Sequence, residues 1–150
     1  MRLRAGVGMR FRETEEYIRR YQLDEYFGPG KTKGVAPIDE GIPIETEVGT
    51  LYGIKAVYDA DWIVHCHHTD VREVPFHRQV DKAVKAFGMS YARIETRSTY
   101  HQNLGPRAAN FTARAIFESP FVQSKFAFAS FLNVGPHGVI GVDADNDLYA

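Results

Sequence analysis

Most of the side chains that could bind a metal ion or move a proton lie between Asp61 and His101. This stretch holds two lysines on a short helical pattern, Lys82 and Lys85, and the only cysteine, Cys66. Imidazoles bind transition metals and act as general bases, and a lysine amine can attach a cofactor covalently. The density of these groups marks the stretch as the candidate functional site. Five of the six histidines of the chain belong to it: His65, His67, His68, His77 and His101.

A pair of histidines flanks the cysteine in the middle of this stretch. His65 and His67 lie on one face of a strand if the strand extends that far. Such a pair at a strand end is typical of metal ligands, and Glu73 and His77 could complete a zinc or iron site, although the spacing matches no standard closed site. The competing interpretation is that each histidine is a hydrogen-bonded residue of the core or its rim. For Cys66, a buried side chain is favoured over an activated thiolate.

The composition of the chain restricts its class. A chain of 150 residues, 44% apolar and 25% charged, suits one globular domain over residues 1–150. A net charge of -1 favours neither nucleic acid nor an anionic membrane as a partner. A lone cysteine indicates a reducing compartment, and neither a signal peptide nor a membrane-spanning run is visible. These features predict a cytoplasmic protein.

Periodicity and turn residues predict an α/β fold, a mixed sheet with flanking helices and a C-terminal β-hairpin. The strand before His67 and His68 is the most apolar and is expected to be central, and sites in such sheets form beyond the carboxyl ends of strands. Lys82 and Lys85 can also be read as a solvated helix face. The predicted helices are Phe11–Tyr21, Phe76–Phe87 with Gly88 as its stop, and Pro106–Phe117. The predicted strands are Arg2–Gly8, Pro43–Val48, Gly53–Tyr58, Trp62–Cys66, Ser90–Thr96, Lys125–Val134 and Val139–Val142, with a turn at 49–52 and a loop at Phe27–Gly34.

Four separated stretches agree, in order, with one known family. Together they resemble the amino-terminal domain of the nickel-dependent lactate racemases, whose cofactor is a nickel-pincer nucleotide. The first stretch is similar to the family's strand, turn and helix, and the second to its Gly-Thr turn. The third begins with a lysine and ends with a histidine, as in the family, and the fourth is similar to its closing hairpin. The stretches are Arg4–Ile18, Glu47–Val64, Lys85–His101 and Phe126–Asp145.

The resemblance implies roles for particular residues. Lys85 would form a thioamide with the cofactor, and His101 would bind its nickel ion. One acid/base histidine of the family is replaced here by Arg10, which stays protonated and cannot act as a base. The second corresponds to His68 or His77, and the alignment does not choose between them.

The reaction that the resemblance implies is the racemisation or epimerisation of a 2-hydroxy acid by proton-coupled hydride transfer to the cofactor. A guanidinium can bind the substrate carboxylate with two hydrogen bonds, and Arg10, Arg72 and Arg78 are the candidates. The family's basic substrate loop and carboxy-terminal domain have no counterpart in this sequence, so a companion domain or a homo-oligomer is expected. Two alternatives remain: a simple zinc or iron enzyme built on the histidine cluster, and a non-catalytic domain that dimerises or docks a partner.

Overall fold

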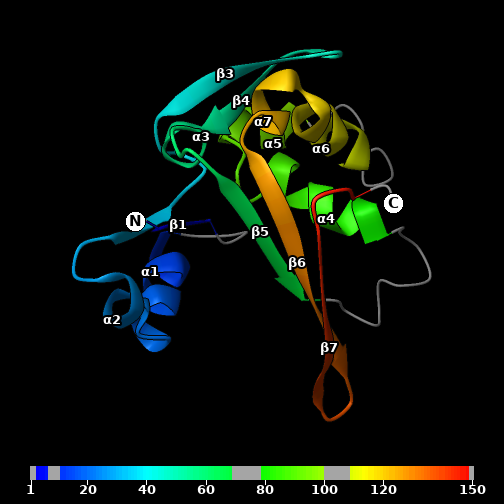
Figure 1. Cartoon of the computed structure of the whole chain (residues 1–150). Coiled ribbons are helices and arrows are strands. Elements are labelled where there is room, and N and C mark those ends of the chain that lie inside the picture. The colour runs from blue at the N-terminus through cyan, green and yellow to red at the C-terminus, as the bar shows by residue number, and fades with distance from the viewer. Residues whose placement is uncertain (1–2, 7–10, 69–78, 100–108, 149–150) are drawn as a thin grey trace.

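The computed structural model describes residues 3–6, 11–68, 79–99 and 109–148. Their helices and strands form an α/β fold, as predicted, with the strands in three small sheets (Figure 1). One sheet is mixed and ends in a C-terminal hairpin. The described strands are β1 (Leu3–Gly6), β2 (Thr32–Val35), β3 (Gly41–Thr46), β4 (Gly49–Ile54), β5 (Ile63–His68), β6 (Phe126–Gly135) and β7 (Gly138–Asp145).

Seven helices accompany these strands in the described ranges. The longest ones agree with the predicted helices, and Gly88 is the last residue of its helix, as expected. A Cβ atom at Gly88 would lie 3.1 Å from the Cβ of Ala113, so this glycine also permits a close approach of two helices. The helices are α1 (Phe11–Arg20), α2 (Leu23–Phe27), α3 (Lys55–Tyr58), α4 (Gln79–Gly88), α5 (Ile94–Thr99), α6 (Ala109–Glu118) and α7 (Pro120–Gln123).

The sheet topology separates the chain into recognisable units. β1 and β2 are parallel and lie beside α1 and α2, at the left of Figure 1. β3 and β4 form an antiparallel hairpin that contacts α5 and α6. β6 pairs in parallel with β5 and antiparallel with β7, so β6 is the central strand of the mixed sheet. The prediction that the strand leading to His67 is central is therefore wrong among the described strands, because β5 pairs with β6 alone.

The hairpin β3–β4 corrects the predicted turn at residues 49–52. Its turn lies two residues earlier, where the Thr46 hydroxyl donates to the Gly49 carbonyl at 2.6 Å and accepts from the Val48 amide at 3.3 Å. Gly49 has a φ of 106°, so it closes the turn instead of opening it. The strand consequently runs over Gly49–Ile54, and the predicted strand residues up to Tyr58 form the short helix α3.

Two other predicted segments also differ. Ser90–Thr96 is not a strand: one isolated bridge joins Ala92 to Gly53, and α5 then begins. The Thr96 hydroxyl bonds both the amide and the carbonyl of Tyr52, at 2.7 and 2.9 Å, and so takes the place of a strand partner. The predicted loop Phe27–Gly34 is a loop only between the end of α2 at Phe27 and the start of β2 at Thr32. Its last three residues belong to β2.

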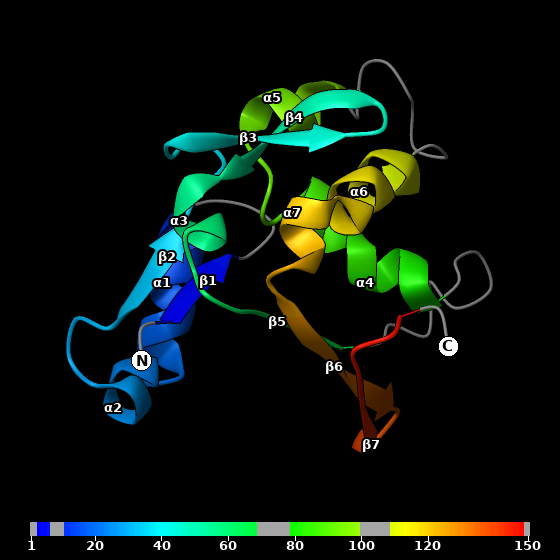
Figure 2. The same cartoon turned by 45° about the horizontal axis from the view of Figure 1, so that its top comes forward.

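The main core lies between α4, α6 and the sheets. Figure 2 shows α4 and α6 side by side, and the two helices share many contacts. Phe87 is fully buried, and its ring centroid lies 5.1 Å from that of Phe117 and 6.3 Å from that of Phe126. These rings attach α4 to one face of the mixed sheet. Among the described helices, none is both long and apolar enough to cross a membrane.

Candidate functional site

β5 distributes its histidines over two faces of the mixed sheet. His65 is buried and His67 half-buried, whereas Cys66 and His68 are exposed. The alternation confirms that His65 and His67 share a face. We call the face that carries them the helix-covered face, because α4 packs against it. The other face, with Cys66 and His68, is called the open face.

The helix-covered face surrounds His65 with aromatic rings. The ring centroid of Phe87, on α4, lies 6.4 Å from that of His65, and Tyr91 meets His65 edge-on at 5.9 Å. His67 pairs with Phe131 in the β5–β6 register, and their rings meet edge-on at 6.5 Å. The ring centroids of His65 and His67 are 5.8 Å apart. The two imidazoles therefore lie together beside apolar rings, and the ring of the exposed His68 stacks on that of His67 with centroids 5.7 Å apart.

The two ring nitrogens of His65 have different surroundings. Nδ1 lies 3.0 Å from the hydroxyl oxygen of Tyr91, within hydrogen-bond distance. Nε2 is buried and has no hydrogen-bond partner within the described ranges. Burial, with a smaller contribution from His67, lowers the pKa of His65 to about 4. His65 is consequently neutral near pH 7, the form in which imidazole binds metals.

Two tyrosines, the fully buried Tyr58 and the half-buried Tyr91, belong to the same region. Burial, and to a smaller extent Cys66, raises the pKa of Tyr91, so its hydroxyl keeps its proton beside His65. Burial likewise raises the pKa of Tyr58, with a smaller contribution from Tyr91. Sequence reasoning missed Tyr91, which lies 26 positions after His65. A tyrosine in a predicted strand has no local signal that identifies it as the partner of a distant histidine.

The open face carries exposed apolar side chains beside Cys66, its strand partner Ser130, and His68. Val64, Phe128, Leu132 and Val142 are 40–62% exposed, and they occupy adjacent positions of the three strands. Cys66 is exposed among them, so the favoured interpretation of a buried cysteine is wrong. The physical reason is strand alternation, since a residue between the inward His65 and His67 must point outward.

The structure does not bring Lys85 and His68 together. Lys85 is exposed on α4, whereas its neighbours Val84 and Phe87 pack into the core. Lys85 therefore points away from the core that α4 shares with the sheet, whereas His68 is exposed at the end of β5. The interpretation of Lys85 as a residue of a solvated helix face agrees with its exposure.

The other predicted site residues cannot be placed. Lys82 belongs to α4, but its side chain is not described. Six other candidates lie outside the described residues: one of the two alternative bases, the three arginines expected to bind the carboxylate, the implied nickel ligand, and the glutamate of the alternative metal site. These are His77, Arg10, Arg72, Arg78, His101 and Glu73.

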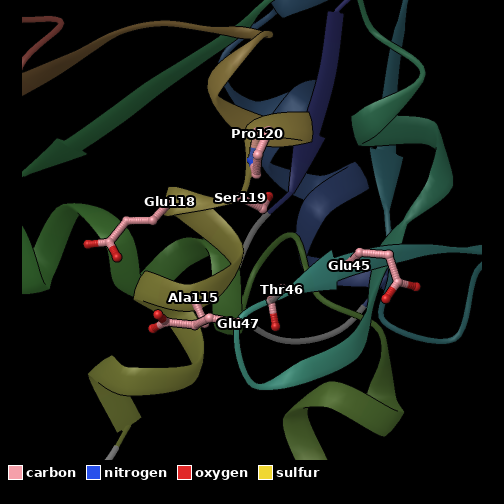
Figure 3. Close-up of a pocket in the computed structure, with 7 residues that line it drawn as sticks. All are labelled: Glu45, Thr46, Glu47, Ala115, Glu118, Ser119 and Pro120. Atoms are coloured by element: carbon pink, nitrogen blue, oxygen red, sulfur yellow. The ribbon is translucent and has the colours of Figure 1, made fainter.

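A pocket lies elsewhere, between the β3–β4 turn and the α6–α7 junction (Figure 3). It has a volume of about 270 Å³ and contains none of the predicted site residues. Figure 3 shows the carboxylates of Glu45 and Glu118 pointing in opposite directions. Ser119, which lines it, caps α7 by accepting from the Val122 amide. Carboxylates that diverge do not form a cation site, so this pocket is not the candidate site.

The metal-binding potential of the described residues is limited to pairs. In the ranges that the structure describes, no three His, Cys, Asp or Glu side chains are grouped closely enough to hold a metal ion. Comparison with known proteins finds no family model and no curated protein that matches the chain. The candidate site therefore depends on the chemistry of β5, which presents one imidazole pair inward and one imidazole outward.

Proposed function

We propose that this chain is part of an enzyme that acts on a 2-hydroxy acid, with a reaction like that of the nickel-dependent lactate racemases. The observation that supports this proposal best is the position of His68. It is an exposed imidazole at the carboxyl end of β5, a strand that runs parallel to its neighbour β6. Such strand ends are where open α/β sheets form their binding sites.

His68 is proposed as the general base. A neutral imidazole can accept the hydroxyl proton of a 2-hydroxy acid, and His68 is open to solvent, so a substrate can reach it. The apolar side chains beside it, Leu132 and Val142, would exclude water from the substrate's carbon chain once it is bound. The substrate carboxylate would bind one of the arginines that the sequence offers, Arg10, Arg72 or Arg78.

The cofactor that the resemblance implies fits one described residue. Lys85 carries an exposed primary amine, which is what covalent attachment of a nickel-pincer nucleotide requires. When bound, this group supplies a hydride acceptor. Lys85 is exposed on α4 and His68 is exposed at the end of β5, so a ligand in contact with both would lie beyond the carboxyl end of this strand. His101, the implied nickel ligand, and His77, the alternative base, stay predictions from the sequence.

The covalent attachment is tested by intact-protein mass spectrometry and metal analysis. The full chain is produced together with the enzymes that synthesise the cofactor. We expect added mass on Lys85 and one equivalent of nickel, both absent from Lys85→Arg and retained in Lys33→Arg, an exposed lysine on β2. An unmodified, nickel-free chain would contradict the proposed cofactor.

The role of the base is tested on the loaded protein with a 2-hydroxy acid such as lactate. His68→Gln should lower kcat by about 10²–10⁴-fold while the adduct on Lys85 is retained. His137→Gln, an exposed histidine in the β6–β7 turn, serves as the control and should leave kcat unchanged. Full activity of His68→Gln would show that another residue is the base.

A further inference from the structure

The buried imidazole of His65 has a ring nitrogen that the fold leaves unused. Its side chain is 3% exposed, and Nε2 has no hydrogen-bond partner in the described part of the chain. Buried polar atoms in folded proteins normally have a partner, because losing water without replacing it costs free energy. The nitrogen on the other side of the ring already lies 3.0 Å from the Tyr91 hydroxyl. Nε2 is therefore the atom to which a ligand of this region would bind.

A second imidazole lies on the same face. His67 is half-buried, and its ring centroid is 5.8 Å from that of His65. Nitrogen ligands bind zinc at about 2.0–2.1 Å, so two rings at this separation can reach one ion with a small side-chain rotation. The pair offers two nitrogen donors on one face, and aromatic rings from Phe87 and Phe131 border it.

We propose that His65, through Nε2, and His67 bind a divalent transition-metal ion of the zinc or iron class. Tyr91 acts as a positioning residue: its hydroxyl oxygen accepts a hydrogen bond from Nδ1–H of His65, which leaves the lone pair on Nε2. Histidine ligands commonly use the second ring nitrogen in this way, and the outer partner fixes the orientation of the ring. Solvent or further side chains complete the coordination.

The chemistry of the face determines the kind of ion. Imidazole nitrogen suits zinc, iron, nickel and copper, whereas calcium and magnesium prefer oxygen ligands. The rings of Phe87, Tyr91 and Phe131 border the two imidazoles, and the Tyr91 hydroxyl lies beside His65. Neither Lys85 nor His68 is a proposed ligand, so the metal site does not depend on the proposed 2-hydroxy acid activity, although the ring of His68 stacks on that of His67 with centroids 5.7 Å apart.

Metal titration of the full chain tests the site directly. The protein is produced without the cofactor-synthesis enzymes, treated with a chelator, and titrated with Zn²⁺ and with Co²⁺ as a spectroscopic probe. We expect one equivalent to bind and the affinity to fall by a factor of about 100 or more in His65→Gln and in His67→Gln, since each variant loses one of two protein ligands. His137→Gln should bind like the unchanged protein.

The use of two ligand variants keeps the test decisive. His65 is buried, so circular dichroism must show that His65→Gln is folded; if it is not, the half-buried His67→Gln decides. The site is disproved if the folded variants bind both ions like the unchanged protein, or if His137→Gln loses binding to the same degree. Neither result affects the mass-spectrometric test of Lys85, so the two proposals fail separately.

Tyr91→Phe tests the positioning role. Loss of an outer-shell partner typically lowers metal affinity by about 10–100-fold, and Co²⁺ titration measures this change. Nitrogen NMR of the metal-free protein gives a second measurement, because ring nitrogen shifts report the tautomer. We expect His65 to carry its proton on Nδ1 in the unchanged protein and to lose this preference in Tyr91→Phe. A tautomer that does not respond to the substitution would overturn the role of Tyr91.

Discussion

The two faces of the mixed sheet carry similar side chains in opposite environments. On the helix-covered face, His65 is buried against Phe87 and hydrogen-bonded to Tyr91. On the open face, three positions along the same strand, His68 is exposed beside apolar side chains. Burial lowers the pKa of His65 to about 4 and holds its ring in one orientation. The same residue type is thus suited to metal binding on one face and to proton transfer on the other.

This difference shows that the position of a histidine in a strand determines its chemistry. Each step along β5 reverses the direction of the side chain, so His65 and His67 face inward while Cys66 and His68 are exposed. His65 and His67 are the two imidazoles that face inward, and the ring of the exposed His68 stacks on that of His67.

The largest expected effect is a difference in the free energy of unfolding between truncations on the two faces of the sheet. Phe87→Ala should lower the free energy of unfolding by about 3–5 kcal/mol, because it opens a cavity among Phe117, Phe126 and His65. Phe128→Ala, on the open face, should lower it by about 1 kcal/mol or less, since that ring is 40% exposed. Urea denaturation measures both. Equal losses would mean that the open face is covered in solution.

A second prediction follows from the lowered pKa of the buried His65 imidazole. In the unfolded chain its pKa is near 6.5, and in the folded protein it is about 4. Between these values the unfolded state binds more protons, so the stability of the metal-free protein should fall as the pH is lowered from 6.5 to 4. The loss can reach about 3 kcal/mol. The titratable neighbours of His65 are His67, Tyr91 and Cys66.

Urea denaturation at several pH values measures this dependence. His65→Leu removes the group that titrates, so the slope of stability against pH should decrease over this range. His137→Gln removes an exposed histidine and should keep the slope of the unchanged protein. If His65→Leu keeps the full slope, the burial of His65 does not control the acid sensitivity of the fold.

Much of the fold could be predicted from local patterns. Helices with strong periodicity, such as α1 and α4, and the β6–β7 hairpin with its Gly-Pro-His-Gly turn agree with the predictions. The errors lie where distant residues decide the structure. The Thr96 side chain bonds the backbone of β4, 44 positions away, where the predicted strand is instead the start of α5. No short window of sequence contains that interaction.

The candidate site was predictable in part for the same reason. Alternation along a strand places His65 and His67 on one face, and it should have placed Cys66 on the opposite, exposed face. The sequence does not show which face a helix covers, because this depends on how Phe87 packs against Phe126. It also does not show that Tyr91 reaches His65. These are tertiary contacts, and they determine which histidine is buried.

The exposure of Cys66 gives a direct measure of access to the open face. Iodoacetamide should alkylate Cys66 in the folded protein at a rate within a factor of about 10 of that in the unfolded chain, because the thiol is exposed. Mass spectrometry follows the reaction, and Cys66→Ser is the blank. A rate lower by several orders of magnitude would indicate that another molecule or segment covers this face.

The smallest expected effect on stability concerns His68 itself. Because its side chain is exposed at the end of β5, His68→Gln should change the free energy of unfolding by about 0.5 kcal/mol or less. His65→Gln should cost more, because glutamine must satisfy its amide in a space that fits a ring between Phe87 and Tyr91. Urea denaturation of the two variants at the same pH gives the comparison. If His68→Gln destabilises the fold as much as His65→Gln does, His68 is a structural residue, and the open face is the wrong place for the general base. If it leaves stability unchanged, any loss of turnover in this variant can be assigned to proton transfer.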